Sequence, residues 1–312
     1  MNPRIGESKT HLTGGKIVGQ NVSHEAYSAQ TAQRGEKDFV MSRGELMEFD
    51  RCPHRWLAGI ESDETKQTEW GQLIDWLVLG DGEAVEKYAI APEMYPCEPT
   101  KKDPRTEKPW NRNSTYCSMW EQSKNEAGLI VVKAETFEMA TNAHRVLLAA
   151  GNDLLFGGKY QVMAIAQYKD EETGLTVPLK VLLDIVPSVD GPYGKCLCDL
   201  KTCNSAALGP WTRAVFEHGY HVQAALYLDV YIAATGEDRT DWLHLIQESY
   251  APWEVGKRLL SAEFVELGRL KYLSALKRYC QCLKSGEWPG YDSGDDTING
   301  WTLVQPEPWM CQ

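Results

Sequence analysis

Residues 179–206, LKVLLDIVPSVDGPYGKCLCDLKTCNSA, predict two adjacent strands and the turn that joins them. Apolar residues surround Asp184 in the first strand, and Asp-Gly-Pro and Tyr-Gly, both typical of turns, follow it. Because side chains alternate between the two faces of a strand, Asp199 and Lys201 share one face of the second strand. Asp184 can then lie across from them. This stretch constrains the fold most, because it requires a sheet with charged groups on neighbouring strands.

The three charged residues suit one kind of chemistry. Two carboxylates on rigid strands can hold Mg²⁺, a hard cation that prefers oxygen ligands and keeps several waters. A lysine beside the metal can orient or deprotonate an attacking water, or offset charge on a phosphate. Metal-assisted phosphodiester hydrolysis needs these parts. The alternative is an ordinary hairpin with an exposed Asp–Lys pair. The spacing taken alone favours that alternative, because such short patterns recur by chance.

Composition limits the remaining classes. The chain has 312 residues, of which 43% are hydrophobic and 24% charged, as in soluble globular proteins of one large or two ordinary domains. No apolar run could span a bilayer, and the N-terminus lacks the apolar core of a signal peptide, so we expect a cytoplasmic protein with no membrane partner. The net charge of −12 is weak evidence against nucleic-acid binding. A nuclease needs only a local basic groove.

Cysteine usage indicates reduced thiols. The nine cysteines are an odd number and show no secreted framework. The pairs Cys196/Cys198 and Cys280/Cys282 have one-residue gaps, whereas zinc sites usually have gaps of two to four residues. Core packing is therefore the preferred interpretation of Cys196 and Cys198.

The chain divides into three parts. Residues 1–38 read as a polar tail, and a structured domain is expected over 39–291. Residues from about 96 to 126 form an insertion into it, which begins as a long loop rich in Pro, Lys and Arg. Residues 292–312 read as an irregular tail. Within the domain, the patterns predict strands at 160–168 and 242–248, and helices at 69–80, 135–150, 209–235 and 261–283. A further helix is expected to be capped by Ser42, and Pro53 ends or restarts it.

Three groups of residues outside the hairpin are candidate functional residues. Asp75 lies within an apolar helix, where a buried carboxylate is costly unless it is paired or bound to metal; its alternative is a partly solvated helix edge. Gln223 and Tyr227 share one face of a helix and could orient a ligand, or make ordinary polar contacts. A basic cluster near the first helix could hold phosphates or be a solvated face; it contains Arg43, Arg51 and Arg55.

Taken in order, these motifs resemble the PD-(D/E)XK nuclease superfamily, in the branch of RecE-like (exonuclease VIII), lambda-exonuclease and RecB-type nucleases. The set comprises Trp70-Gly-Gln-Leu-Ile-Asp75, Leu183-Asp184, Asp199-Leu-Lys201-Thr202, Gln223-x3-Tyr227, the strand LIQES and the ending GEWPGY. The resemblance covers 39–291. It implies an α/β fold with a restriction-endonuclease-like core, in which helices flank a mixed central sheet.

The resemblance also implies roles for single residues. Asp184, Asp199 and Lys201 would be catalytic. Metal ligands would be Asp75, Asp184, Asp199 and the backbone carbonyl of Leu200. Substrate would be positioned by Gln223 and Tyr227, with Thr202, Ser205, Arg43, Arg51 and Arg55 as further contacts. Asp75 is a departure, because RecE- and RecB-like relatives carry His there and lambda exonuclease carries Glu. The number of bound metals therefore stays open.

The activity implied is an Mg²⁺-dependent exonuclease, with Mn²⁺ as a substitute, that digests double-stranded DNA ends from 5′ to 3′. It would leave 3′ overhangs for recombination through a single-strand annealing protein, and a homo-oligomeric ring (trimer or tetramer) would hold the DNA. An iron–sulfur cluster on Cys52, Cys280, Cys282 and Cys311 is disfavoured by their spacing. The alternatives are an endonuclease or defence nuclease of the same fold, or an inactive module that binds DNA ends or protein.

Overall fold

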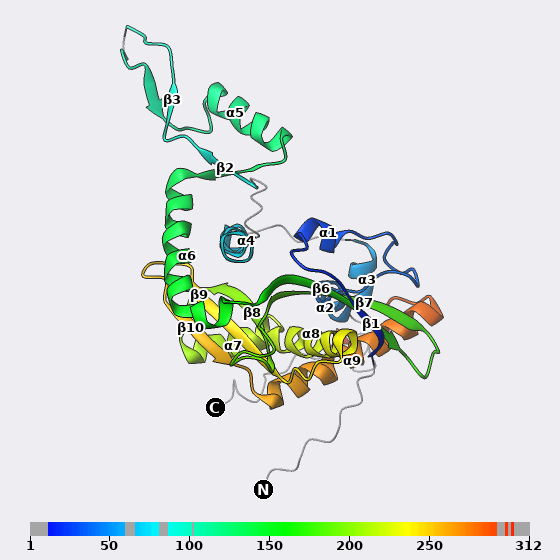
Figure 1. Cartoon of the computed structure of the whole chain (residues 1–312). Coiled ribbons are helices and arrows are strands. Elements are labelled where there is room, and N and C mark those ends of the chain that lie inside the picture. Colours follow the sequence, from blue (N-terminus) through cyan, green and yellow to red (C-terminus); the bar gives the residue numbers. More distant parts are fainter. Residues whose placement is uncertain are drawn as a thin grey trace.

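The computed structural model describes residues 12–59, 66–80, 87–101, 103–291, 297–298 and 301–302. Within them, six strands form one mixed sheet in the order β1-β6-β7-β8-β9-β10 (Figure 1). Neighbouring strands are antiparallel except β8 and β9, which run parallel. The strands are β1 (Leu12–Gly19), β6 (Lys159–Lys169), β7 (Thr176–Val186), β8 (Cys196–Cys203), β9 (Asp241–Glu248) and β10 (Val255–Leu259). The expected mixed central sheet is confirmed.

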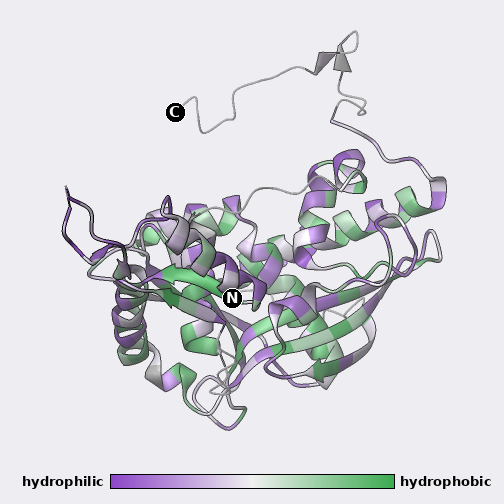
Figure 2. Cartoon of the chain, turned by 90° about the horizontal axis from the view of Figure 1, so that it is seen from above, coloured by the Kyte–Doolittle hydropathy of each residue, from purple (hydrophilic) through white to green (hydrophobic). Residues whose placement is uncertain are grey.

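Helices cover both faces of the sheet, and each face has its own apolar core (Figure 1). One core lies under α8 (Tyr220–Thr235) and α9 (Ala262–Ser285), and the other under α4 (Lys66–Leu79) and α6 (Ala134–Leu155). Hydrophobic residues follow the strands and the helix faces turned toward them (Figure 2). Adjacent residues of β8 divide between the cores, with Leu197 in the first and Cys198 in the second. The alternation predicted for β8, and the core packing of its cysteines, are therefore confirmed.

Several predicted helix boundaries are confirmed by their caps. Ser42 caps α2 (Arg43–Arg51) by accepting a hydrogen bond from the Glu45 amide, and Pro53 starts α3 (Pro53–Leu57). Ser261 caps α9 in the same way through the Phe264 amide.

The helix predicted for 209–235 is two helices. α7 (Leu208–Glu217) ends at His218, and α8 begins at Tyr220. Between them Gly219 has a φ of 65°, in the left-handed region that favours glycine. The break turns the chain, so that α8 becomes a central helix with a continuous buried run from His221 to Tyr231.

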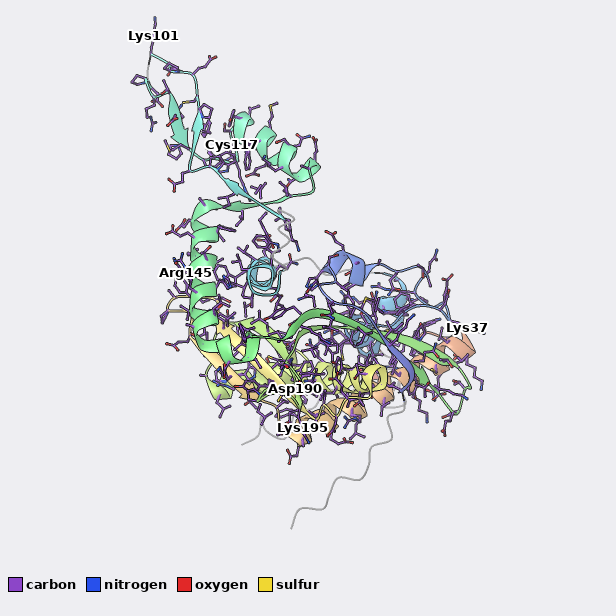
Figure 3. The ribbon with its side chains drawn as sticks, in the orientation of Figure 1. Lys37, Lys101, Cys117, Arg145, Asp190 and Lys195 are labelled. Carbon is purple, nitrogen blue, oxygen red and sulfur yellow. The ribbon has the colours of Figure 1, made fainter. Side chains whose placement is uncertain are left out.

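The region expected to be a long loop instead has secondary structure of its own. β3 (Met94–Pro96) and β4 (Glu107–Pro109) pair as a hairpin, and α5 (Thr115–Glu126) follows. β2 (Tyr88–Ala91) pairs in parallel with β5 (Ile130–Lys133) at the base. Together they form an arm that projects from the body, with Lys101 at its tip (Figures 1 and 3). Arg105 and Lys108 both pair with Asp103, which stabilises the hairpin rather than leaving these cations free.

The N-terminal segment corrects the prediction of a polar tail over residues 12–38; residues 1–11 of that predicted tail lie outside the described residues. Residues Leu12–Gly19 form β1, which pairs antiparallel with β6 at the edge of the central sheet. α1 (His24–Ser28) follows and is tied to the sheet by Lys180, whose Nζ donates to the carbonyls of Tyr27 at 2.6 Å and Ala29 at 3.1 Å. β1 escapes detection because Leu12 is its only buried residue. The described helices include none that is long and apolar enough to cross a membrane.

Candidate active site

The candidate site lies where β7 and β8 separate. Ile185 and Cys198 form the paired position between these strands, and the same register sets Asp184 opposite Asp199. Oδ2 of Asp184 accepts a hydrogen bond of 3.0 Å from the Leu200 amide. A side chain thus takes the place of a backbone acceptor, so the ladder opens and two carboxylates face each other across the gap. The cross-strand position predicted for Asp184 is confirmed.

Lys201 and Asp199 form a close ion pair on the face of β8 that the alternation predicted. Lys201 Nζ lies 2.6 Å from Oδ2 of Asp199, and it also donates to the Leu200 carbonyl at 3.3 Å. The Asp199 side chain is only 2% exposed, whereas that of Lys201 is 22% exposed. This is not the solvated Asp–Lys pair of an ordinary hairpin. The ammonium neutralises a buried carboxylate and still reaches the solvent side of the site.

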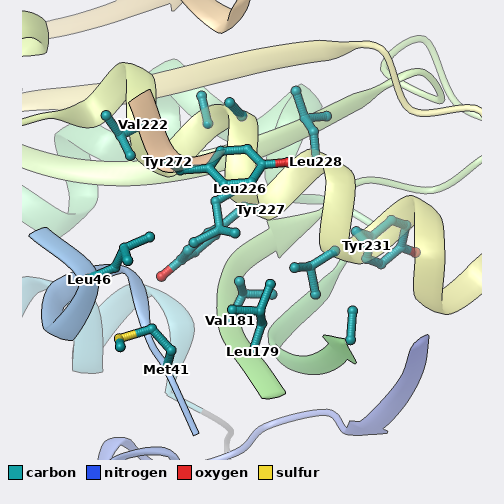
Figure 4. Close-up of a cluster of buried hydrophobic side chains, with 14 of the residues drawn as sticks. Met41, Leu46, Leu179, Val181, Val222, Leu226, Tyr227, Leu228, Tyr231 and Tyr272 are labelled. Atoms are coloured by element: carbon teal, nitrogen blue, oxygen red, sulfur yellow. The ribbon is translucent and has the colours of Figure 1, made fainter. Parts of the chain in front are cut away.

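Gln223, on α8, is a second side chain that binds Asp199. Its Nε2 donates a hydrogen bond of 2.6 Å to Oδ1 of Asp199. Gln223 therefore reaches the carboxylates from α8. The substrate-positioning roles of Gln223 and Tyr227 stay predictions. Tyr227 itself is mostly buried, and its ring reaches from α8 toward Met41 and Leu46 (Figure 4).

Asp75 approaches the same carboxylates from α4. Burial raises its pKa to about 7, Asp199 adds to the rise, and the ammoniums of Lys201 and Lys87 oppose it. Gly71 lies one turn earlier, on the same face of the helix, and a Cβ there would lie 3.2 Å from Oγ1 of Thr202. The glycine lets α4 come close to β8, which brings Asp75 to the site.

The electrostatics of the site are set by three carboxyl groups, Asp75, Asp184 and Asp199, close to the Lys201 ammonium. Burial raises the pKa of Asp184 well above its usual range, and Asp199 and Asp75 raise it further. Burial alone would lower the pKa of Lys201, but Asp199 and Asp184 outweigh burial and raise it. Lys201 is therefore an ammonium at neutral pH.

Sequence reasoning missed the residues that the N-terminal segment and β9 bring to the site. Burial and the ammoniums of Lys87 and Lys201 lower the pKa of His24, which begins α1. His244 lies beside Asp199 in the parallel register of β8 and β9, and burial lowers its pKa to about 4. Its Nε2 accepts from the indole of Trp242 at 3.1 Å. The LIQES pattern marked the strand but not His244, which directly precedes it.

Arg43 and Arg51, two of the basic residues predicted near the first helix, contact groups other than the three aspartates. Arg43 donates to the backbone carbonyl of His218, beside the start of α8. Arg51 is exposed and pairs with Glu48 at 3.0 Å, and Arg55 is exposed on α3. Ser205 follows β8, and its hydroxyl accepts from the Ala207 amide at 3.4 Å. Arg43, Arg51, Arg55, Thr202 and Ser205 all stay predictions as substrate contacts.

The donor chemistry of the site fits a hard divalent cation. Asp75, Asp184 and Asp199 supply carboxylate oxygens from three elements, and their mutual repulsion would be offset by a metal. In the part of the chain that the structure describes, no three His, Cys, Asp or Glu side chains converge closely enough to hold an ion by themselves. Mg²⁺ commonly takes one or two carboxylates and completes its shell with water and substrate phosphate.

The cysteines considered for a cluster stay separate from this site. Cys52, Cys280 and Cys282 are buried free thiols, and Cys311 lies outside the described residues. Burial raises the pKa of Cys280 to about 11, so it is a neutral thiol at physiological pH.

The mixed sheet opens at Asp184 and Asp199, and Lys201 follows Asp199 by two residues. This is the arrangement of the PD-(D/E)XK nuclease fold. The chain belongs to the family described as "PDDEXK-like domain of unknown function (DUF3799)", whose model matches residues 42–297. The crystal structure of a protein named "Putative exonuclease", from Eubacterium rectale, has the same fold. Its TM-score is 0.54 at 16% identity, covering 94% of this chain and 98% of that one. No curated protein matches the chain.

Proposed function

We propose that this protein is a divalent-metal-dependent deoxyribonuclease that removes nucleotides from the ends of double-stranded DNA. The observation that supports it is the 2.6 Å pair of Lys201 and Asp199, next to Asp184 on the adjoining strand. The name of the structural relative favours exonuclease over endonuclease activity. A reaction at DNA ends also suits an acidic chain, because it needs only a local basic path for the backbone.

Each residue has a definite part in the proposed reaction. Asp184 and Asp199 would hold Mg²⁺ or Mn²⁺, with Asp75 bound directly or through a water and the Leu200 carbonyl as a further donor. The metal would polarise the phosphate and acidify a water. Gln223 fixes the orientation of Asp199 through its hydrogen bond. Lys201 keeps its positive charge beside the carboxylates, where it can orient the attacking water and offset charge that develops on the phosphate.

The finer features of the proposal come from the resemblance of the motifs. Digestion would run from 5′ to 3′, leave a 3′ overhang, and supply a single-strand annealing protein during recombination. A homo-oligomeric ring of three or four subunits would confine positive potential to a channel, although each subunit carries a net charge of −12. Light scattering of the purified protein would measure the number of subunits.

The decisive experiment gives purified protein two substrates with Mg²⁺. One is a linear duplex labelled at either the 5′ or the 3′ end, and the other is a closed circle. Lys201→Ala and Asp184→Ala serve as inactive controls, with their folding checked by circular dichroism. We expect loss of the linear duplex from its 5′ ends, an intact circle and no activity in either variant.

Other results would change the proposal in defined ways. Cleavage of the closed circle would replace the exonuclease by an endonuclease of the same fold. A fully active Lys201→Ala would remove the assignment of this site. Absence of cleavage with Mg²⁺ and Mn²⁺ would favour a module that binds DNA ends or protein.

A further inference from the structure

The catalytic lysine of the proposed reaction has an aromatic neighbour that the family motifs do not include. Tyr220 is the first residue of α8, directly after the left-handed Gly219. Lys201 Nζ lies over its ring, 5.6 Å from the ring centroid. The ammonium therefore has the Asp199 carboxylate at 2.6 Å and the face of an aromatic ring as a second neighbour.

The Tyr220 ring is itself held on several sides. Trp211 from α7 stacks on it, with ring centroids 5.5 Å apart and an interplanar angle of 25°. The imidazoles of His244 and His218 lie 5.9 Å and 5.5 Å from it. Trp211 and His244 are buried, so the ring has little freedom to move away from Lys201. This arrangement depends on the break between α7 and α8, which brings Trp211 back against Tyr220.

The Tyr220 ring restricts the position of the Lys201 ammonium. The face of an aromatic ring carries negative potential and attracts a cation, more strongly when both are shielded from water. Without the ring, the flexible four-carbon stem of Lys201 would let the ammonium turn toward solvent or DNA phosphates. Contacts with both the ring and Asp199 restrict the ammonium to a position beside the carboxylates, where the proposed reaction needs it.

We propose that Tyr220 is a positioning residue that holds the Lys201 ammonium beside Asp199 through its aromatic face. The inference rests on the proposed nuclease function for its catalytic consequence, but the ring–ammonium contact can be tested without activity. The ring is the active part, and the phenol hydroxyl is not required.

Two substitutions separate the ring from the hydroxyl. Tyr220→Phe keeps the aromatic face and should cleave within about twofold of the wild type, because Phe also binds cations. Tyr220→Leu fills similar space without the face. It should lower kcat by roughly 10- to 100-fold with little change in KM, since a misplacement of about 1 Å in a catalytic group has such an effect. Phe216→Leu removes an exposed aromatic ring of α7 that stacks on His221 and not on Tyr220; it is the matched control and should keep the wild-type kcat.

A double-mutant cycle tests the contact in the absence of metal and substrate. Urea unfolding is measured for the wild type, Tyr220→Leu, Lys201→Met and the double variant, because Met keeps the length of the stem without its charge. The cycle should show a coupling of roughly 2- to 30-fold in the unfolding equilibrium constant. The parallel cycle with Phe216→Leu in place of Tyr220→Leu should show none.

The outcomes are distinct. Equal loss of kcat in Tyr220→Phe and Tyr220→Leu would assign the role to the hydroxyl and overturn the proposal. A cycle without coupling would overturn it as well, whatever the kinetics. Coupling in a protein that cleaves no DNA would instead overturn the proposed function and leave the contact established.

Discussion

The side-chain amide of Gln223 donates a hydrogen bond of 2.6 Å to Oδ1 of Asp199, and both side chains are buried. This bond joins α8 to β8 at the centre of the candidate site. It also leaves Lys201 as the partner of the other carboxylate oxygen.

Gln223→Ala should therefore weaken both folding and cleavage. It leaves a buried carboxylate oxygen without its donor, which should lower the free energy of unfolding by about 1–3 kcal/mol. Urea denaturation and DNA cleavage measure the two effects. Gln122→Ala, which removes an exposed contact to Glu126 on α5, is the control and should change neither. Wild-type stability and activity in Gln223→Ala would contradict the assigned role.

Asp75 should make the metal-free protein less stable as the pH rises. Burial, with Asp199 adding to it, raises the folded-state pKa of Asp75 to about 7, whereas an unfolded aspartate titrates near pH 4. Between these values the folded state keeps a proton that the unfolded state has released. Stability is thus fully present below about pH 4 and is lost as the pH passes about 7.

Urea unfolding in chelator at several pH values measures this dependence. One such group contributes at most about 1.4 kcal/mol per pH unit, and less for Asp75 because its side chain is partly exposed. Asp184, whose pKa burial also raises, acts with the same sign. Asp75→Asn should make the slope shallower; an unchanged slope would show that Asp75 does not titrate in this range.

Gly71→Ala should reduce cleavage more than stability. The added methyl would lie 3.2 Å from Oγ1 of Thr202, so α4 or Thr202 must shift by a few tenths of an ångström. Alanine also favours a helix over glycine by about 1 kcal/mol, which offsets the strain in the unfolding free energy. Asp75 lies one turn further along the same face and would move with the helix.

Gly44→Ala in α2 is the matched control for Gly71→Ala. There the new methyl makes only ordinary contact, 3.9 Å from the Ser42 hydroxyl. We expect it to keep full activity and to gain a little stability. Full activity in Gly71→Ala would mean that Asp75 tolerates the shift.

Gly15→Val should destabilise the fold, although the residue lies in the segment that its composition presents as a tail. A Cβ at Gly15 would lie 2.4 Å from the backbone of Ala233 in α8, and a backbone cannot rotate away as a side chain can. Overpacking of this kind costs about 1–3 kcal/mol of unfolding free energy. Gly209→Ala, where nothing lies within 4 Å, is the control. Equal unfolding midpoints for Gly15→Val and the wild type would show that β1 does not pack against α8.

Local patterns in the amino-acid sequence predicted most of the helices and strands and the residues of the candidate site. Alternation in 196–203 placed Asp199 and Lys201 on one face, and helical spacing placed Gln223 and Tyr227 on another. Such periodicities are set by the geometry of a single strand or helix, so they can be read without knowing what packs against them. The ordered motifs then led to the family that the chain matches over 42–297.

The distant segments that meet at that site could be identified only from the folded structure. The strand β1 could not be predicted from its sequence, since it has too few buried apolar residues. Its place in the sheet depends on backbone bonds to β6. The break at Gly219 turns Tyr220 onto Lys201, and α1 brings His24 near the same ammonium. These contacts join residues far apart in the chain. No local spacing encodes such contacts, since they arise from how whole elements pack.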